Sequence, residues 1–230
     1  MTNTCYMCSK PATTREHAPP RCLFPAQKYS LNGKDQRVNL IVVPACDEHN
    51  GDKSADDQYL MHILPMSFGL NEVADHYFQT KVQESIASNN RLTKSLAGSA
   101  VQVKVHDLDK DEWTQTLAFK VDMVRLMGVL EMNARAIYFR HHNAKLTTKL
   151  SSLTNFTLLG NSLQLNVLLN RVMSEGEEML DAVGAERHGP NPDVFFYRIA
   201  REGNLELLEF TFYGTSKVLF AIDHSVAQQV

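Results

Sequence analysis

All four cysteines of this 230-residue chain lie within its first 46 residues, as Cys5, Cys8, Cys22 and Cys46. Cys5 and Cys8 form a CxxC pair, and Cys46 forms a CxxH pair with His49. Each pair sits on a tight turn that can point two side chains at one ion, so together they supply the four thiolate and imidazole ligands that Zn²⁺ requires. We therefore predict a structural zinc site that stabilises a segment too short to build its own core.

The alternative interpretation of these residues is two unrelated turns and a surface histidine. Two complete pairs, in a chain with only one other cysteine, favour the zinc interpretation. The 37 residues between Cys8 and Cys46 exceed the gap of a DNA-reading finger, which indicates a different kind of zinc module. Cys22 fits neither pair, and we expect it to be a small buried hydrophobic residue rather than a nucleophile.

Charge and hydropathy exclude several classes of protein. The formal net charge of −3 excludes both a strongly basic, histone-like binder and a strongly acidic disordered tail. The sequence contains no run of about 18 apolar residues, so we expect no membrane-spanning helix. The first residues lack the charged and apolar regions of a signal peptide, so we expect a cytoplasmic protein without a membrane partner.

Composition also divides the chain. Residues 1–53 contain five of the eight prolines and carry seven basic against five acidic side chains, whereas residues 54–230 carry 16 basic and 21 acidic ones. Periodicity in the second part predicts an α+β fold. The expected helices cover residues 54–64, 71–89, 121–139 (opened by Asp122) and 162–183 (ended by Gly184), and the expected strands cover residues 101–105, 194–200, 205–213 and 218–222.

Between and beside the two zinc pairs lie Glu16-His17, Asn39-Leu40 and, directly after His49, Asn50. The order CxxC, acidic residue–His, Asn–Leu, CxxH–Asn resembles the HNH endonucleases of the ββα-metal group in their zinc-stabilised form. The local sequence at residues 16–20, 43–46 and 54–57 also resembles that of poorly characterised bacterial HNH proteins. The specific motifs cover about residues 5–57, and beyond them the resemblance is weak.

The resemblance implies both an architecture and an activity. It implies a small zinc-stabilised ββα-metal module at residues 1–66, followed by an α+β region at residues 67–230 that is a candidate for partner binding, sensing or dimerisation. The implied activity is metal-dependent hydrolysis of phosphodiester bonds in nucleic acid, DNA rather than RNA. A role in defence against phage follows by analogy alone.

The resemblance also assigns roles to individual residues. His17 would be the general base, because its pKa lies near working pH. Glu16 and, from the start of a helix, Asn50 would supply hard oxygen ligands to a catalytic Mg²⁺ or Mn²⁺. Asn39 would brace the loop and orient His17. Most members of the family carry Asp where this chain has Glu16.

Each of these assignments has an alternative. A second hypothesis is a catalytically inactive zinc-framed module that binds nucleic acid or protein, although such a copy would be expected to lose His17 or Asn50. An RNA-directed toxin is a third hypothesis, since the chemistry requires only a phosphodiester. Lys53, Arg15 and Arg21 are candidates for phosphate contacts, but solvated side chains are the simpler expectation.

Three further polar groups have a simpler structural interpretation. Asp56 and Asp57 suit the first turn of a helix, where the dipole favours negative charge. His141-His142 would end a long helix, where a positive ring suits the opposite end of the dipole. We expect neither group to bind the metal.

Overall fold

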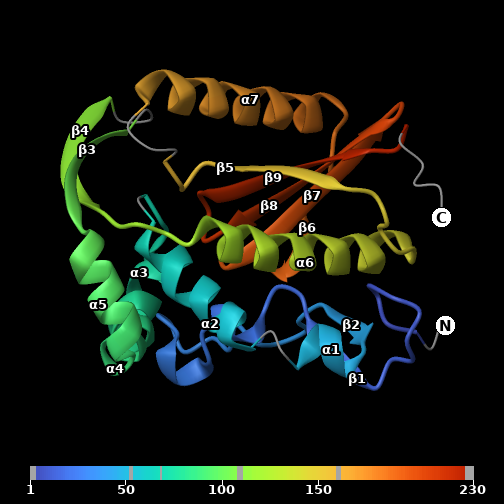
Figure 1. The fold of residues 1–230 in the computed structure, drawn as a ribbon, viewed down its shortest axis with the longest axis horizontal. Coiled ribbons are helices and arrows are strands. Elements are labelled where there is room, and N and C mark those ends of the chain that lie inside the picture. Colours follow the sequence, from blue (N-terminus) through green and yellow to red (C-terminus); the bar gives the residue numbers. More distant parts are fainter. Residues whose placement is uncertain (1–3, 52–53, 68, 108–110, 159–161, 226–230) are drawn as a thin grey trace.

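The chain is a mixed α+β protein with helices and antiparallel sheets, as the sequence predicts (Figure 1). The computed structural model describes residues 4–51, 54–67, 69–107, 111–158 and 162–225. Figure 1 shows four layers: helix α7 (Leu163–Ala182), a five-stranded sheet, helix α6 (Met123–His142), and the N-terminal segment with its metal-binding residues. The layers place the N-terminal segment on the side of α6 that faces away from the sheet.

The N-terminal segment contains a short antiparallel strand pair followed by a short helix. Strand β1 (Thr14–His17) pairs with β2 (Val42–Ala45), and α1 (Asp47–Asn50) begins directly after Cys46. The long connection between the strands carries two 3₁₀ turns, Arg21–Leu23 and Gln27–Tyr29. This element order is strand, strand, helix, but the elements are short and do not by themselves establish a ββα-metal module.

A run of helices follows, and the first of them, α2 (Ser54–Ile63), packs against α6. The others are α3 (Glu72–Tyr77), α4 (Gln83–Ser88) and α5 (Asn90–Ser99). The helix predicted over residues 71–89 is confirmed, but a π-helical turn at Phe78–Val82 joins α3 to α4. Helix α5 was not predicted from the sequence.

Helix α6 is buried on more than one face, because it lies between the sheet and the N-terminal segment. Leu126, Leu130 and Ile137 are fully buried, and Asp122 caps the first turn by accepting a hydrogen bond from the backbone N–H of Arg125 at 3.1 Å. The predicted start at Asp122 is therefore confirmed. Before α6, strands β3 (Val101–Asp107) and β4 (Glu112–Ala118) form a separate hairpin.

The C-terminal half forms the main sheet, in the order β5-β9-β8-β7-β6, with every pair antiparallel. Its side chains alternate between the two faces. On the α6 side, the Phe210 ring packs between those of Phe195 and Phe220, with centroids 5.2 and 5.1 Å away. Met173 and Leu180 of α7 cover Leu207 and Leu219 on the other face. The strands are β5 (Leu150–Thr154), β6 (His188–Asn191), β7 (Phe195–Glu202), β8 (Leu205–Phe212) and β9 (Ser216–Asp223).

One hydrophobic cluster links the N-terminal segment to the sheet. It includes Cys5 and Tyr6 at one end of the chain and Ile222 at the other. Tyr213 is fully buried, and its hydroxyl donates a hydrogen bond to the carbonyl oxygen of Leu23 at 2.6 Å. The division at residues 66 and 67 remains a prediction. Within the described ranges, none of the helices combines the length and apolarity needed to cross a bilayer.

Candidate metal centre

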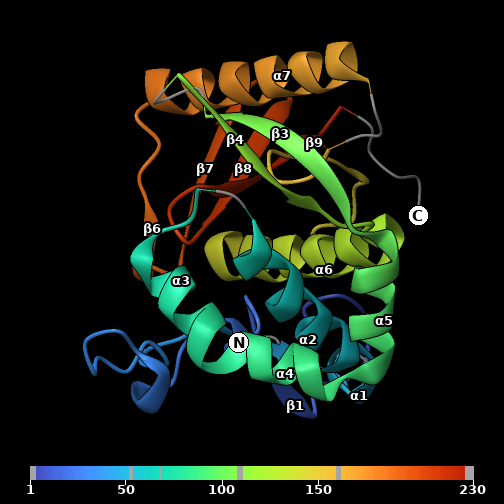
Figure 2. The same ribbon diagram turned by 90° about the vertical axis from the view of Figure 1, so that its left-hand side faces the viewer.

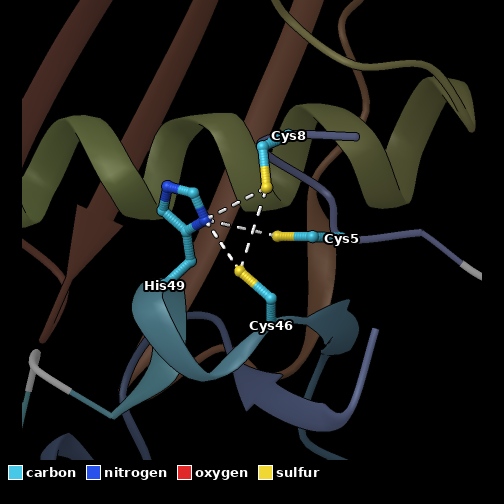
Figure 3. A group of neighbouring side chains, drawn as sticks. All are labelled: Cys5, Cys8, Cys46 and His49. Atoms are coloured by element: carbon cyan, nitrogen blue, oxygen red, sulfur yellow. Dashed lines mark hydrogen bonds between the residues drawn. The ribbon is translucent and has the colours of Figure 1, made fainter. Parts of the chain in front are cut away.

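Cys5, Cys8, Cys46 and His49 come together in one cluster, shown in Figure 3. Below it is called the Cys₃His cluster. The Nδ1 atom of His49 lies 3.2 Å from Cys46 Sγ, 3.5 Å from Cys5 Sγ and 3.6 Å from Cys8 Sγ. Cys8 Sγ and Cys46 Sγ are 3.8 Å apart.

These separations suit a tetrahedral ion. With Zn–S bonds of about 2.3 Å and a Zn–N bond of about 2.0–2.1 Å, the ligand atoms of a regular tetrahedron stand about 3.6–3.8 Å apart. All four ligand atoms of the Cys₃His cluster lie within 4.8 Å of one another, and two of the cysteines are buried. The cluster can therefore bind a metal ion such as zinc, as the spacing of the two pairs predicts.

Local backbone geometry explains why the two pairs converge. The backbone N–H of Cys5 donates to the Lys10 carbonyl at 2.9 Å, which closes the first turn, and the N–H of Met7 points at Cys5 Sγ from 3.4 Å. Burial opposes ionisation of Cys5, but backbone N–H groups, with that of Met7 foremost, outweigh it and lower the pKa of the Cys5 thiol. The second pair lies on the single turn of α1, which Cys46 opens.

The cluster is fixed to its surroundings by contacts on both sides. The N–H of Tyr6 donates to the Pro44 carbonyl at 2.8 Å, which joins the first turn to β2. Lys145, just after α6, donates through Nζ to the Cys8 carbonyl at 2.6 Å. The Tyr6 ring is buried and lies edge-on to the His49 ring, with centroids 6.5 Å apart. The sequence analysis identified neither Tyr6 nor Lys145 as part of the site. For Tyr6, the one available sequence signal was an aromatic residue inside a CxxC turn.

Glu16 and His17 occupy the last two positions of β1, opposite Val43 and Val42 of β2. Glu16 is only 3% exposed, whereas His17 is half-buried. Burial lowers the pKa of His17, the positive charge of Arg21 lowers it further, and the negative charge of Glu16 partly opposes both effects. The imidazole of His17 is therefore biased toward its neutral form.

Asn50 ends α1 rather than beginning a helix, because α1 already starts at Asp47. Its side-chain Nδ2 donates to the backbone carbonyl of Arg15 at 3.5 Å, directly before Glu16. The amide of Asn50 thus lies against the strand that carries the predicted acidic residue–His pair.

Asn39 lies three residues before β2, exposed, with a left-handed φ of 56°. Among the described residues, no hydrogen bond joins Asn39 to His17. The proposed role of Asn39 in orienting His17 is therefore not supported by a direct hydrogen bond among the described residues, and it stays a prediction.

The other residues considered from the sequence lie mostly where their structural interpretation put them. Asp56 is in the first turn of α2 and forms an ion pair with Arg125. Cys22 is half-buried, and its Sγ donates to the Asp57 carbonyl at 3.3 Å. Arg15 and Arg21 are exposed, and Lys53 lies outside the described residues.

His141 and His142 end α6, as predicted, and His142 has a partner that the sequence did not suggest. Its Nε2 lies 2.7 Å from one carboxylate oxygen of Glu206, a residue that is 2% exposed. His224 Nε2 lies 2.8 Å from the other carboxylate oxygen. This arrangement ties the end of α6 to β8 and to the residues after β9.

No known protein family, curated protein or solved structure matches this chain. The resemblance to HNH endonucleases thus rests on the motif residues alone, and the Cys₃His cluster does not establish it. The structure itself shows an α+β protein with a Cys₃His cluster near its N-terminus that can bind a metal ion such as zinc.

Proposed function

We propose that the chain is a metal-dependent endonuclease of the HNH type, hydrolysing phosphodiester bonds in nucleic acid. One observation carries the proposal: the Cys₃His cluster fixes α1 beside β1, so that the Asn50 amide lies 3.5 Å from the Arg15 carbonyl, next to Glu16 and His17. The Asn50 side chain at the end of α1 thereby lies against the strand that carries Glu16 and His17.

The donor atoms that Glu16 and Asn50 would supply suit a hard divalent cation. Glu16 offers carboxylate oxygens, and an amide that donates through its nitrogen, as Asn50 does, keeps its oxygen available as a ligand. Oxygen donors of this kind are preferred by Mg²⁺ and Mn²⁺, whereas the thiolates of the Cys₃His cluster suit Zn²⁺. When bound, the cation would neutralise charge on the scissile phosphate and the departing 3′ oxygen.

His17 would take the proton from the attacking water. A general base must be neutral before the reaction, and the lowered pKa of His17 favours that form at neutral pH. Glu16 beside it would stabilise the imidazolium formed by proton transfer. Asn39 is assigned to the loop that precedes β2, in a positioning role.

The proposed substrate is DNA, with RNA as the alternative that the same chemistry allows. Residues 1–53 carry a small positive excess, seven basic against five acidic side chains, and Arg15 and Arg21 are exposed near His17. Anti-phage defence is the proposed biological setting, by analogy only. The competing proposal is an inactive zinc-framed module that binds nucleic acid or protein through the same face.

A cleavage assay tests the proposal. Zinc-loaded protein is incubated with supercoiled plasmid or with structured RNA, in Mg²⁺, Mn²⁺ or EDTA. We expect cleavage that EDTA abolishes and that His17→Ala slows by about 10²–10⁴-fold, with zinc content and melting temperature nearly unchanged. His76→Ala, on α3, serves as the matched control and should keep full activity.

Three results would contradict the nuclease proposal. The first is a wild-type protein that cleaves neither substrate with either cation, and binding without cleavage would then favour the inactive module. The second is cleavage that persists in His17→Ala. The third is loss of zinc in His17→Ala, which would make His17 a structural ligand.

A further inference from the structure

Three histidine rings meet where the end of α6 packs against the edge of the main sheet. His141 and His142 are the last residues of α6, and His188 is the first residue of β6, an edge strand. The His141 ring contacts the other two edge-on, with its centroid 4.8 Å from that of His142 and 5.1 Å from that of His188. We call these three residues the α6–β6 histidines.

Buried partners hold these rings in place. Nδ1 of His141 lies 3.2 Å from the hydroxyl of Tyr197 on β7, and the Tyr197 ring stacks on that of His188 with centroids 5.1 Å apart. Nε2 of His142 is hydrogen-bonded to Glu206 at 2.7 Å. Tyr197 and Glu206 are both nearly fully buried. Separating the three imidazoles would therefore break these contacts and detach the end of α6 from the sheet.

The α6–β6 histidines are not arranged as a metal site. Within the described ranges, the Cys₃His cluster is the one group of three or more such side chains whose ligand atoms converge. His141 turns its Nδ1 to Tyr197, and His142 turns its Nε2 to Glu206, so these nitrogens face different neighbours. The chemistry that remains for three adjoining imidazoles is the gain and loss of protons.

Protonation would place like charges side by side here. Imidazole is the side chain whose ordinary titration falls between pH 5 and 8. Two imidazolium rings in contact repel each other, and water and salt screen a partly enclosed pair less than an exposed one. Glu206 compensates a charge on His142, but among the residues that the structure describes neither His141 nor His188 forms an ion pair with a carboxylate. A charge on either of these two rings is therefore compensated only from a distance.

The surroundings of His141 favour its neutral form. Partial burial of the ring lowers the pKa of His141, and the charges of His142 and then His188 lower it further. The negative charge of Glu206 opposes this shift, as does the dipole of α6 at its last turn. The other titratable or charged side chains around the α6–β6 histidines are Tyr138, Arg140, Tyr197, Arg201, Glu206 and His224.

The direction of this shift fixes the sign of the pH dependence. A histidine whose pKa is lowered by folding takes up a proton more readily in the unfolded chain than in the folded one. It therefore stabilises the fold above its ordinary pKa of about 6.5, and that contribution is lost as the pH falls below this value.

We propose that the α6–β6 histidines form an acid-sensitive latch. While the rings are neutral, they hold the end of α6 against β6 and β7. When they take up protons, the like charges push the rings apart and the end of α6 detaches from the sheet. The latch belongs to the fold and does not depend on the proposed nuclease activity.

The latch is connected to the metal-binding segment through Lys145. This residue lies shortly after His142 and donates through Nζ to the Cys8 carbonyl at 2.6 Å and to the Thr4 hydroxyl at 3.1 Å. Helix α6 lies between the main sheet and the N-terminal segment in both views (Figures 1 and 2). Release of its end would therefore also loosen the turn that carries Cys5 and Cys8.

The first test compares the protons taken up on unfolding. Urea denaturation of the full zinc-loaded chain at a series of pH values gives this number from the slope of stability against pH. We expect the wild type to take up as much as about one proton more than His141→Asn between pH 6.5 and 5.5, so that its unfolding constant rises up to about tenfold more over that interval. The slope is the measured quantity, so a change in overall stability of the variant does not affect the result.

A matched control removes an imidazole elsewhere. His76→Asn, on α3, should keep the wild-type slope. The Cys₃His cluster is present in all three proteins, so its own titration cancels in the comparison. Equal slopes for the wild type and His141→Asn, or an equal change in His76→Asn, would overturn the proposal.

The second test locates the release. Hydrogen exchange of the zinc-loaded chain is measured at about pH 7.5 and 5.5, with each rate corrected for the exchange rate of an unfolded peptide at the same pH. We expect acid to reduce protection at residues 139–146 and 4–10 of the wild type more than in His141→Asn, and to leave α7 protected in both. Unchanged protection at the end of α6, or an equal loss in α7, would overturn the latch. Neither test measures cleavage, so the latch and the proposed function can fail separately.

Discussion

His49 and Asn50 are neighbours in sequence but serve different partners. The His49 ring turns its Nδ1 to the three cysteines, and the Asn50 amide meets the backbone of β1. Consecutive positions on a helical turn diverge by about 100°, so two adjacent residues can face two different ions. Under the proposed function, the hardness of the donors would then decide which ion each residue holds.

Substitution should separate the two ions. We expect Asn50→Ala to raise the Mn²⁺ concentration needed for half-maximal cleavage, while about one zinc per chain is retained. Cys46→Ala should instead lose zinc and lower the melting temperature of the N-terminal segment. A Mn²⁺ titration of activity, with elemental analysis in parallel, measures both, and Asn90→Ala on α5 serves as the control. Loss of zinc from Asn50→Ala would refute the two-ion arrangement.

The sequence predicted the Cys₃His cluster because its ligands lie on two local turns, and a turn fixes its own side chains. It did not predict what holds those turns in place. Lys145 reaches the Cys8 carbonyl from 137 residues away, and no local pattern encodes such a contact. Nor does a local pattern encode the left-handed φ of 56° that Asn39 adopts.

At the scale of elements, helices with clear caps were predicted best. Asp122 and Ser162 accept hydrogen bonds from the first turns of α6 and α7, and both starts were read from the sequence. The missed strands lack the alternation on which prediction depends. Strand β4 lies on an exposed hairpin with almost no buried side chain, and β6 is an edge strand that contains Gly189 and Pro190.

Glu206 links three elements, so its replacement tests how they are held together. Removing the carboxylate leaves His142 and His224 without their shared acceptor beside a buried position. We expect Glu206→Ala to lower the free energy of unfolding by about 1–3 kcal/mol, measured by urea denaturation. Glu202→Ala, exposed at the end of β7, should change it by less than about 0.5 kcal/mol. Equal effects of the two substitutions would show that the imidazole contacts contribute nothing.

At the scale of the whole molecule, the N-terminal segment shares its core with the C-terminal half. Tyr6 and Leu23 are buried in the same cluster as Phe210 and Phe220. A fragment cut at the predicted boundary would expose this surface to water, at a cost of roughly 25 cal/mol for each Å² of apolar area.

We therefore expect residues 1–66, made alone with zinc, to hold the metal more weakly than the full chain. Competition with a chromophoric chelator measures the affinity of both, and circular dichroism reports whether the fragment folds. Equal zinc affinity and a cooperative thermal transition in the fragment would show instead that residues 1–66 form an independent domain.

The hydrogen bond from Tyr213 to the Leu23 carbonyl also has a consequence in time. Ribosomes add about 5–20 residues each second, so Tyr213 is made on the order of 10–40 s after Leu23. During that interval the two cysteine turns can already capture zinc, but the surface on which they rest does not yet exist. The metal centre is therefore expected to reach its final geometry only when synthesis of the sheet is complete. Until then, a nascent chain would contain the proposed cleavage residues without positioning them for the reaction.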